Sequence, residues 1–177
     1  MNKDVEAFLS KQEEEKIVDA IRTAERKTSG EIRVHIEPTA GKMDIFDRAM
    51  EVFHALKMDN TKQANGVLIY VAVEDRNFVI YGDKGINDVV PDNFWESTKD
   101  MIVSQFKKGD FAKGLIDGVL KAGEELQKHF PWDEMDTNEL SDQISKGWTY
   151  QTTTTFTRLN LHIQSPGATG NTSKASS

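Results

Sequence analysis

Acidic side chains flank a short apolar segment near the middle of the chain. The segment "FVIYG" occupies residues 78–82, and acids stand before and after it. These acids are Glu74, Asp75, Asp83, Asp88 and Asp92. Carboxylate oxygens are the ligands that hard cations prefer, and Ca²⁺ takes about six to eight oxygens. The pattern therefore indicates either a cation site or ordinary turn acids that keep the strand ends soluble.

Several other kinds of site are excluded by the residues that the chain lacks. There is no cysteine, so there is no thiolate metal site, disulfide or cysteine nucleophile. The glycine-rich phosphate loops, the H-E-x-x-H zinc motif, the EF-hand loop and the G-x-S-x-G nucleophile elbow are all absent. The four histidines lie far apart without zinc-ligand spacing. Carboxylates remain as the candidate ligands.

Length and charge limit the class of protein further. A chain of 177 residues with a net charge of -7 is typical of one acidic globular domain. All 29 acids precede residue 146, and an acidic body repels nucleic acids and anionic membranes. Neither a signal-peptide pattern nor an apolar stretch of about 20 residues is present. We expect a cytoplasmic monomer without membrane insertion, which could have an unknown protein partner.

The elements that would position the acids can be predicted from periodicity. Ser10 and Glu13 form a capping-box pattern before an apolar stripe at helical spacing. "EIRVHIEP" alternates and predicts a half-buried strand, with His35 on the solvated face. Asp44 is a suitable cap for a second helix. "NGVLIYVAV" is apolar on both faces, and a tight "EDRN" turn leads into "FVIYG", which predicts a β-hairpin.

Two further helices, over about 92–108 and 110–130, follow the hairpin. The order is therefore α-β-α-β-β-α-α, which predicts an α/β fold: a helix-covered mixed β-sheet sandwich. We expect this domain to span residues 1–132. Residues 133–145 read as an acidic connector, and 146–177, rich in Thr, Ser and Gly, as a disordered or vector-derived tail.

This topology predicts that polar residues gather at one edge of the sheet. Parallel strands one and two would start at the same edge, and the antiparallel third strand would end there. The expected metal ligands are Glu31, Asn65, Asp83, Asp88 and Asp92. The opposite edge offers a rival set: Glu37, Asp44, Glu74 and Asp75. Helix capping by Asp44 and Asp92, with ordinary turn acids, is the purely structural alternative.

Five ordered motifs resemble the TPM domain family across residues 4–130. These are "DVEAFLS", "TSGEIRVHI", "NGVLIYVA", "YGDKGINDVVPD" and "FKKGDFAKGL". Carried over by position, the resemblance matches Glu31, Asn65, Gly82, Gly85 and Asp92, whereas Asn87 replaces the usual Glu of the family. The resemblance implies an α/β sandwich. It also implies either of two activities reported for members, Ca²⁺ binding or acid phosphatase activity.

Three functions follow as hypotheses. The first is a non-enzymatic binding module that holds Ca²⁺ or Mg²⁺ at the acidic edge of the sheet. The second is a metal-assisted acid phosphatase, in which the cation would lower the pKa of a bound water. The third is a metal-free scaffold that binds a partner. Only Lys84 is evident near the acidic edge as a cationic phosphate clamp, which favours binding over hydrolysis.

Overall fold

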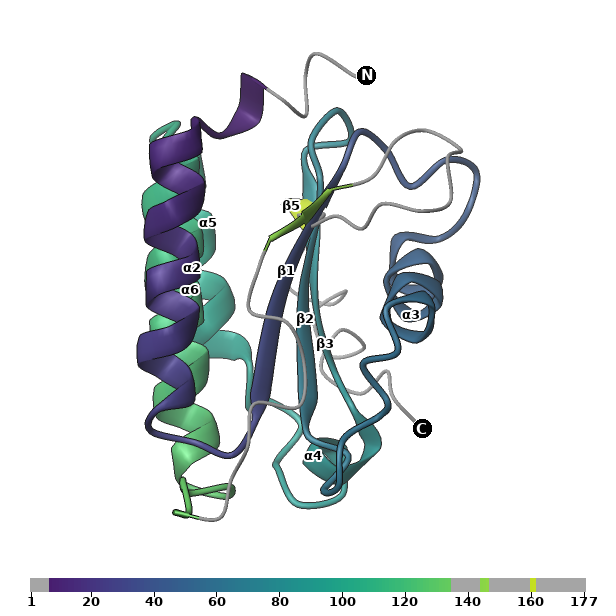
Figure 1. Ribbon diagram of the computed structural model, residues 1–177. Coiled ribbons are helices and arrows are strands. Elements are labelled where there is room, and N and C mark those ends of the chain that lie inside the picture. Colours follow the sequence, from purple (N-terminus) through teal and green to yellow (C-terminus); the bar gives the residue numbers. More distant parts are fainter. Residues whose placement is uncertain (1–6, 135–143, 147–159, 162–177) are drawn as a thin grey trace.

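The computed structural model describes residues 7–134, 144–146 and 160–161 (Figure 1). Its centre is a mixed β-sheet with the strand order β4-β1-β2-β3-β5. The three longer strands are β1 (Glu31–Glu37), β2 (Gly66–Ala72) and β3 (Asn77–Gly82). Two-residue strands, β4 (Ser145–Lys146) and β5 (Asn160–Leu161), extend the two edges. The predicted element order and fold class are confirmed.

Helices cover both faces of the sheet (Figure 1). On one face lie α2 (Lys11–Glu25), α5 (Glu96–Lys107) and α6 (Phe111–Gln127). On the other face lies α3 (Ile45–Ala55), and the short α4 (Lys84–Asn87) follows β3 directly. Each face has its own buried apolar cluster, so the sheet is the middle layer of a three-layer sandwich. None of the helices in the described part of the chain has the length and hydropathy of a membrane span.

The strand register brings three strand ends to one edge of the sheet. β1 and β2 run parallel with Glu31 opposite Gly66, and β3 runs antiparallel to β2 with Gly82 opposite Val67. The starts of β1 and β2 and the end of β3 therefore lie side by side. We call this edge the acidic rim and define it by Glu31, Asn65 and Asp83.

Local capping follows the sequence closely. The N–H of Glu13 donates to Ser10 Oγ at 3.1 Å, and the N–H of Ser10 donates to the Glu13 carboxylate at 2.7 Å. Asp44 accepts from the N–H of Phe46 at 2.9 Å, which caps α3 as predicted. These bonds satisfy donors that the first turn of a helix cannot pair internally.

Two local features differ from the prediction. The helix expected over 92–108 begins at Glu96, because a turn over 92–95 places Phe94 and Trp95 in the core. Their rings pack edge to face with centroids 4.7 Å apart. The second feature, α4, was not predicted, and its cap is Asp83. Burial of large aromatic surface outweighs a favourable cap, so packing sets the start of α5.

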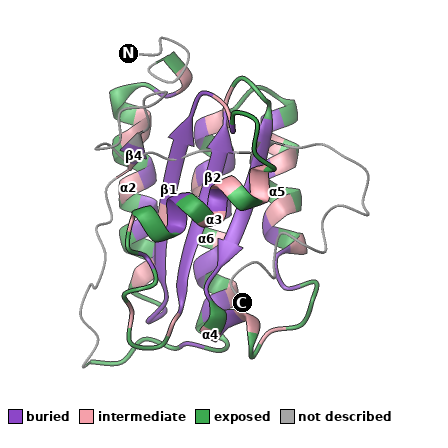
Figure 2. Cartoon of the chain, turned by 90° about the vertical axis from the view of Figure 1, so that its right-hand side faces the viewer, coloured by how far each residue is buried: buried purple, intermediate pink, exposed green. Residues whose placement is uncertain are grey.

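The strand over 31–37 is buried on both faces, not on one (Figure 2). His35 is only 2% exposed, so the prediction of a solvated strand histidine is wrong. Its Nδ1 lies 3.2 Å from Ser145 Oγ of β4, and its ring stacks on Tyr70 of β2. β4 and the ring of Tyr70, both distant from His35 in sequence, therefore cover the face of β1 that was predicted to be exposed to solvent.

The C-terminal part of the chain contributes to both edges of the sheet. β4 pairs with β1 at His35 and Ile36, and β5 pairs with β3 at Asn77 and Phe78, both in parallel. The predicted connector and tail contained no strand pattern, so neither short strand was expected. The remaining residues of 135–177 lie outside the described part, and the predicted domain boundaries there stay predictions.

Candidate metal site

The three residues that define the acidic rim are all buried. The exposed fraction is 4% for Glu31, 1% for Asn65 and 7% for Asp83. The sequence analysis offered exposed turn acids as one interpretation of these residues. For Asp83 an exposed position is wrong, because its side chain is buried. A buried carboxylate has lost its hydration, so it requires compensation from protein donors, a proton or a cation.

Strand alternation places Glu31 and Asp83 on the face of the sheet that α3 covers. Gly66 of β2 lies between them, since it pairs with Glu31 and its carbonyl accepts from the N–H of Asp83 at 2.9 Å. Two strand spacings separate the two acids, roughly 10 Å between Cα atoms. The Met58 carbonyl oxygen lies over Gly66: a Cβ atom added to Gly66 would lie only 2.8 Å from it. The Glu31 carboxylate, the Met58 carbonyl and the Asp83 carboxylate are therefore arranged in this order across the rim.

Asp83 is held by the backbone of α4 through one carboxylate oxygen only. Oδ1 accepts from the N–H of Lys84 at 2.7 Å, whereas Oδ2 is buried and has no donor among the described residues. Burial raises the pKa of Asp83 above its ordinary value, and the charge of Asp59 raises it further; the Lys84 N–H and His54 oppose this. An acceptor without a donor is costly, and it is suited to a cation.

Asn65 is anchored by three hydrogen bonds at the start of β2. Its N–H donates to Thr61 Oγ1 at 3.1 Å, its Nδ2 donates to Ser29 Oγ at 3.3 Å, and its carbonyl accepts from the N–H of Glu31 at 3.3 Å. Its Oδ1 is buried without a donor in the described part of the chain. The rim therefore contains a second buried oxygen without a donor among the residues that the structure describes.

Gly85 of α4 is in close contact with the backbone of the loop before β2, at residues 63–64. The N–H of Gly85 donates to the carbonyl of Ala64 at 2.8 Å. A Cβ on Gly85 would lie 2.0 Å from the carbonyl oxygen of Gln63 and 2.7 Å from that of Ala64. Only glycine therefore allows these two backbone carbonyls to approach α4 so closely. The contact holds in place the loop that carries Asn65.

The remaining two predicted ligands lie apart from the buried rim. Asp88 is exposed at the C-cap of α4, and Asp92 is exposed in the turn before α5. Among residues 7–134, 144–146 and 160–161, no three His, Asp or Glu side chains form a group that could hold an ion. A cation at the rim would therefore need amide, backbone carbonyl and water oxygens in addition to carboxylates.

The rival acids at the opposite edge are engaged by the protein itself. Asp75 accepts from Thr39 Oγ1 at 2.9 and 3.0 Å and from the N–H of Ala40 at 2.8 Å. Asp44 caps α3, and Glu37 accepts two hydrogen bonds from Arg48. These contacts account for three of the four rival acids through loop and helix structure.

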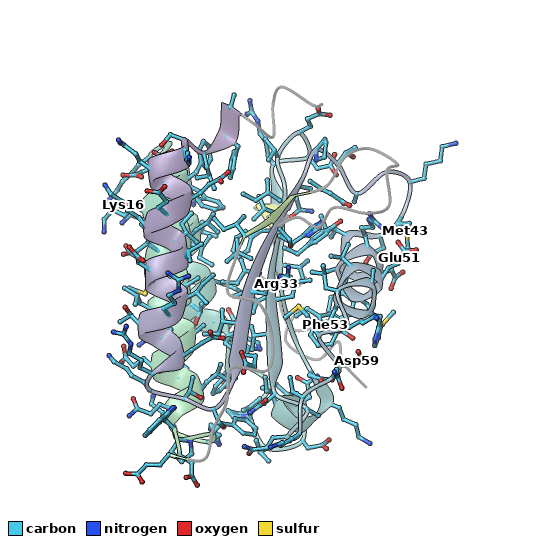
Figure 3. The ribbon with its side chains drawn as sticks, viewed as in Figure 1. Lys16, Arg33, Met43, Glu51, Phe53 and Asp59 are labelled. Atoms are coloured by element: carbon cyan, nitrogen blue, oxygen red, sulfur yellow. The ribbon has the colours of Figure 1, made fainter. Side chains whose placement is uncertain are left out.

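Two arginines near these strands were missed by the sequence analysis. Arg48 of α3 pairs with Glu37, which is 5% exposed and also accepts from Tyr70 Oη at 3.3 Å. Arg33 follows Glu31 by two residues and lies in the space between the sheet and α3 (Figure 3). The strand alternation that placed Glu31 could also have placed Arg33 beside it.

The raised pKa of Asp83 predicts a specific pH dependence. The folded protein holds a proton on Asp83 more tightly than the unfolded chain does. The unmutated protein should therefore gain stability relative to Asp83→Asn as pH falls through the folded pKa towards about 4. Urea unfolding of both proteins at pH 7 and pH 4.5, in EDTA, measures the difference. A difference that is the same at both pH values, or that changes in the opposite direction, would contradict the assignment.

Comparison with known proteins agrees with the fold. The model of the TPM domain matches residues 2–125, so the chain belongs to the TPM domain family. No curated protein matches the chain.

The chain is also similar to solved structures, two of which are the following. The NMR structure of the BA42 protein from the psychrophilic bacterium Bizionia argentinensis has 64% sequence identity and a TM-score of 0.77. The match covers 81% of this chain and 98% of that chain. The NMR structure of the N-terminal domain of a P. gingivalis protein has 25% identity and a TM-score of 0.58, covering 70% of this chain and 79% of that one.

Proposed function

We propose that this TPM-domain protein binds a divalent cation, Ca²⁺ or Mg²⁺, at the acidic rim. The observation that carries the proposal is the pair of buried oxygens, Asp83 Oδ2 and Asn65 Oδ1, which lack a donor among the described residues. Glu31 begins the adjacent strand, and the Met58 carbonyl lies between the two acids. All of these are hard oxygen ligands of the kind that Ca²⁺ takes.

The proposed role is binding and not hydrolysis. Glu31 and Asp83 are almost fully buried, so a bound ion would be enclosed by the loop over 57–65 and by α4. An enclosed ion stabilises the surrounding loops, whereas a catalytic ion needs an open coordination position for water. The metal-assisted phosphatase is the second candidate, favoured by Arg33, a cation that follows Glu31 by two residues on the same face of β1. A metal-free partner-binding scaffold is the third.

Cation binding predicts a thermal shift that depends on the rim. Millimolar Ca²⁺ should raise the melting temperature, because a ligand at a hundredfold excess over its Kd stabilises the folded state by about 2.7 kcal/mol. Asp83→Asn should weaken this response while it keeps the cap of α4, since Asn is also a good N-cap. The measurement is calorimetry with and without Ca²⁺, and in parallel amide chemical shifts over residues 58–92.

The matched control is Glu74→Gln at the opposite edge of the sheet, which should leave the Ca²⁺ response unchanged. An unmutated protein that shows no shift with Ca²⁺ or Mg²⁺ would refute the proposal and leave the scaffold. Loss of the shift in Glu74→Gln but not in Asp83→Asn would move the site to the rival edge. Metal-dependent turnover of p-nitrophenyl phosphate that disappears in Glu31→Gln would establish the phosphatase.

A further inference from the structure

Two arginines face the space between the sheet and α3, and among the described residues only Arg48 has a carboxylate partner. Arg48 donates from Nε to Glu37 at 3.2 Å and forms a second ion pair with Glu51. Arg33, on β1, has a buried Nε with no acceptor in the part of the chain that the structure describes. No ion pair of Arg33 is present among the described residues.

The two guanidinium groups differ in their electrostatics as well. Burial lowers the pKa of Arg48, but the carboxylates of Glu37 and Glu51 outweigh it and raise the pKa overall. Burial also lowers the pKa of Arg33, and no carboxylate of the described residues offsets this shift. A desolvated cation without an acceptor destabilises the folded state. Proteins retain such local conflicts mainly at functional sites, where a ligand resolves them.

We propose that Arg33 anchors a binding site for an oxyanion, a phosphate or carboxylate group, between β1 and α3. Because Nε is buried, the planar guanidinium would donate from its two Nη groups to two oxygens of the same anion. Arg33 is only half-buried, and α3 packs mainly on β2 and β3. Glu31 lies two residues before Arg33 on the same face, and its charge will weaken the affinity.

This site is distinct from the proposed cation site, because it requires no metal. Its ligand would nevertheless lie close to the acidic rim, since successive residues on one face of a strand are roughly 6.6 Å apart. A phosphate group held by Arg33 would therefore present its remaining oxygens towards the end of β1 at which Glu31 lies.

The test is a titration of the full chain with inorganic phosphate in EDTA, at constant ionic strength set with chloride. The Nε–Hε signal of Arg33 in nitrogen–proton correlation spectra should shift saturably, whereas that of the exposed Arg22 should not. Arg33→Gln should weaken binding about 10- to 100-fold, as expected for loss of charge-assisted hydrogen bonds. A parallel titration with acetate shows whether a carboxylate suffices or a phosphate is required.

Stability provides a second readout that does not depend on the signal assignment. Without an anion, Arg33→Met should leave the melting temperature unchanged or raise it, because it removes a half-buried charge that has no carboxylate partner among the described residues. Phosphate should then stabilise the unmutated protein but not Arg33→Met. The proposal is wrong if neither phosphate nor acetate moves the Arg33 signal, or if Arg33→Met responds to phosphate like the unmutated protein. A missing Ca²⁺ response would refute the cation proposal alone.

Discussion

Replacing Gly85 by alanine is expected to destabilise the protein by about 2–4 kcal/mol and to displace the loop before β2. The added Cβ would lie 2.0 Å from the Gln63 carbonyl oxygen and 2.7 Å from the Ala64 carbonyl oxygen. Both atoms belong to the backbone, so a change of side-chain rotamer cannot relieve the overlap. The hydrogen bond from Gly85 N–H to Ala64 must lengthen or break.

Thermal unfolding measures this effect, and a decrease of about 5–15 °C is expected. The matched control is Gly82→Ala, three residues earlier, where a Cβ would have only ordinary contacts of 3.5–3.6 Å. Because the loop carries Asn65, Gly85→Ala should also shift the amide signals of residues 61–66 and weaken any Ca²⁺ response. Equal melting temperatures for the two alanine variants would show that the loop does not press against α4 as described.

Replacing Arg48 by methionine should cost about 3 kcal/mol of folding free energy. The substitution would remove the strongest partner of Glu37, a carboxylate that is 5% exposed between the sheet and α3. Tyr70 Oη at 3.3 Å and His35 Nε2 at 3.7 Å would remain near it. A neutral hydroxyl and an imidazole compensate a buried negative charge less well than a guanidinium does.

The double variant Glu37→Met with Arg48→Met distinguishes the contribution of the Arg48–Glu37 ion pair to stability from the contribution of side-chain packing. Two methionines of similar length would replace the ion pair, and buried ion pairs are often replaceable by apolar residues at little cost. The double variant should therefore be more stable than Arg48→Met alone, which urea unfolding and a double-mutant cycle would quantify. Additive losses in the two single variants would show that the pair does not act as a unit.

The order of elements and the relative directions of the strands could be predicted from sequence because they depend on local patterns. The capping box at Ser10 and Glu13 defined the start of α2, and the tight turn before Asn77 predicted the antiparallel hairpin. Parallel pairing of β1 with β2 then followed from the intervening helix. These inferences were sufficient to bring Glu31, Asn65 and Asp83 to one edge.

Only the tertiary structure decided which polar residues are buried and which are paired. Nothing local distinguishes Arg33 from Arg48, yet α3 carries Arg48 against Glu37, while Arg33 has no carboxylate partner in the described part of the chain. Asp83 and Asp88 are both acids next to α4, but Asp83 is buried at the end of the sheet and Asp88 is exposed. Desolvation depends on atoms that come from distant parts of the sequence. The chemistry of the rim therefore follows from packing, which residue spacing alone does not encode.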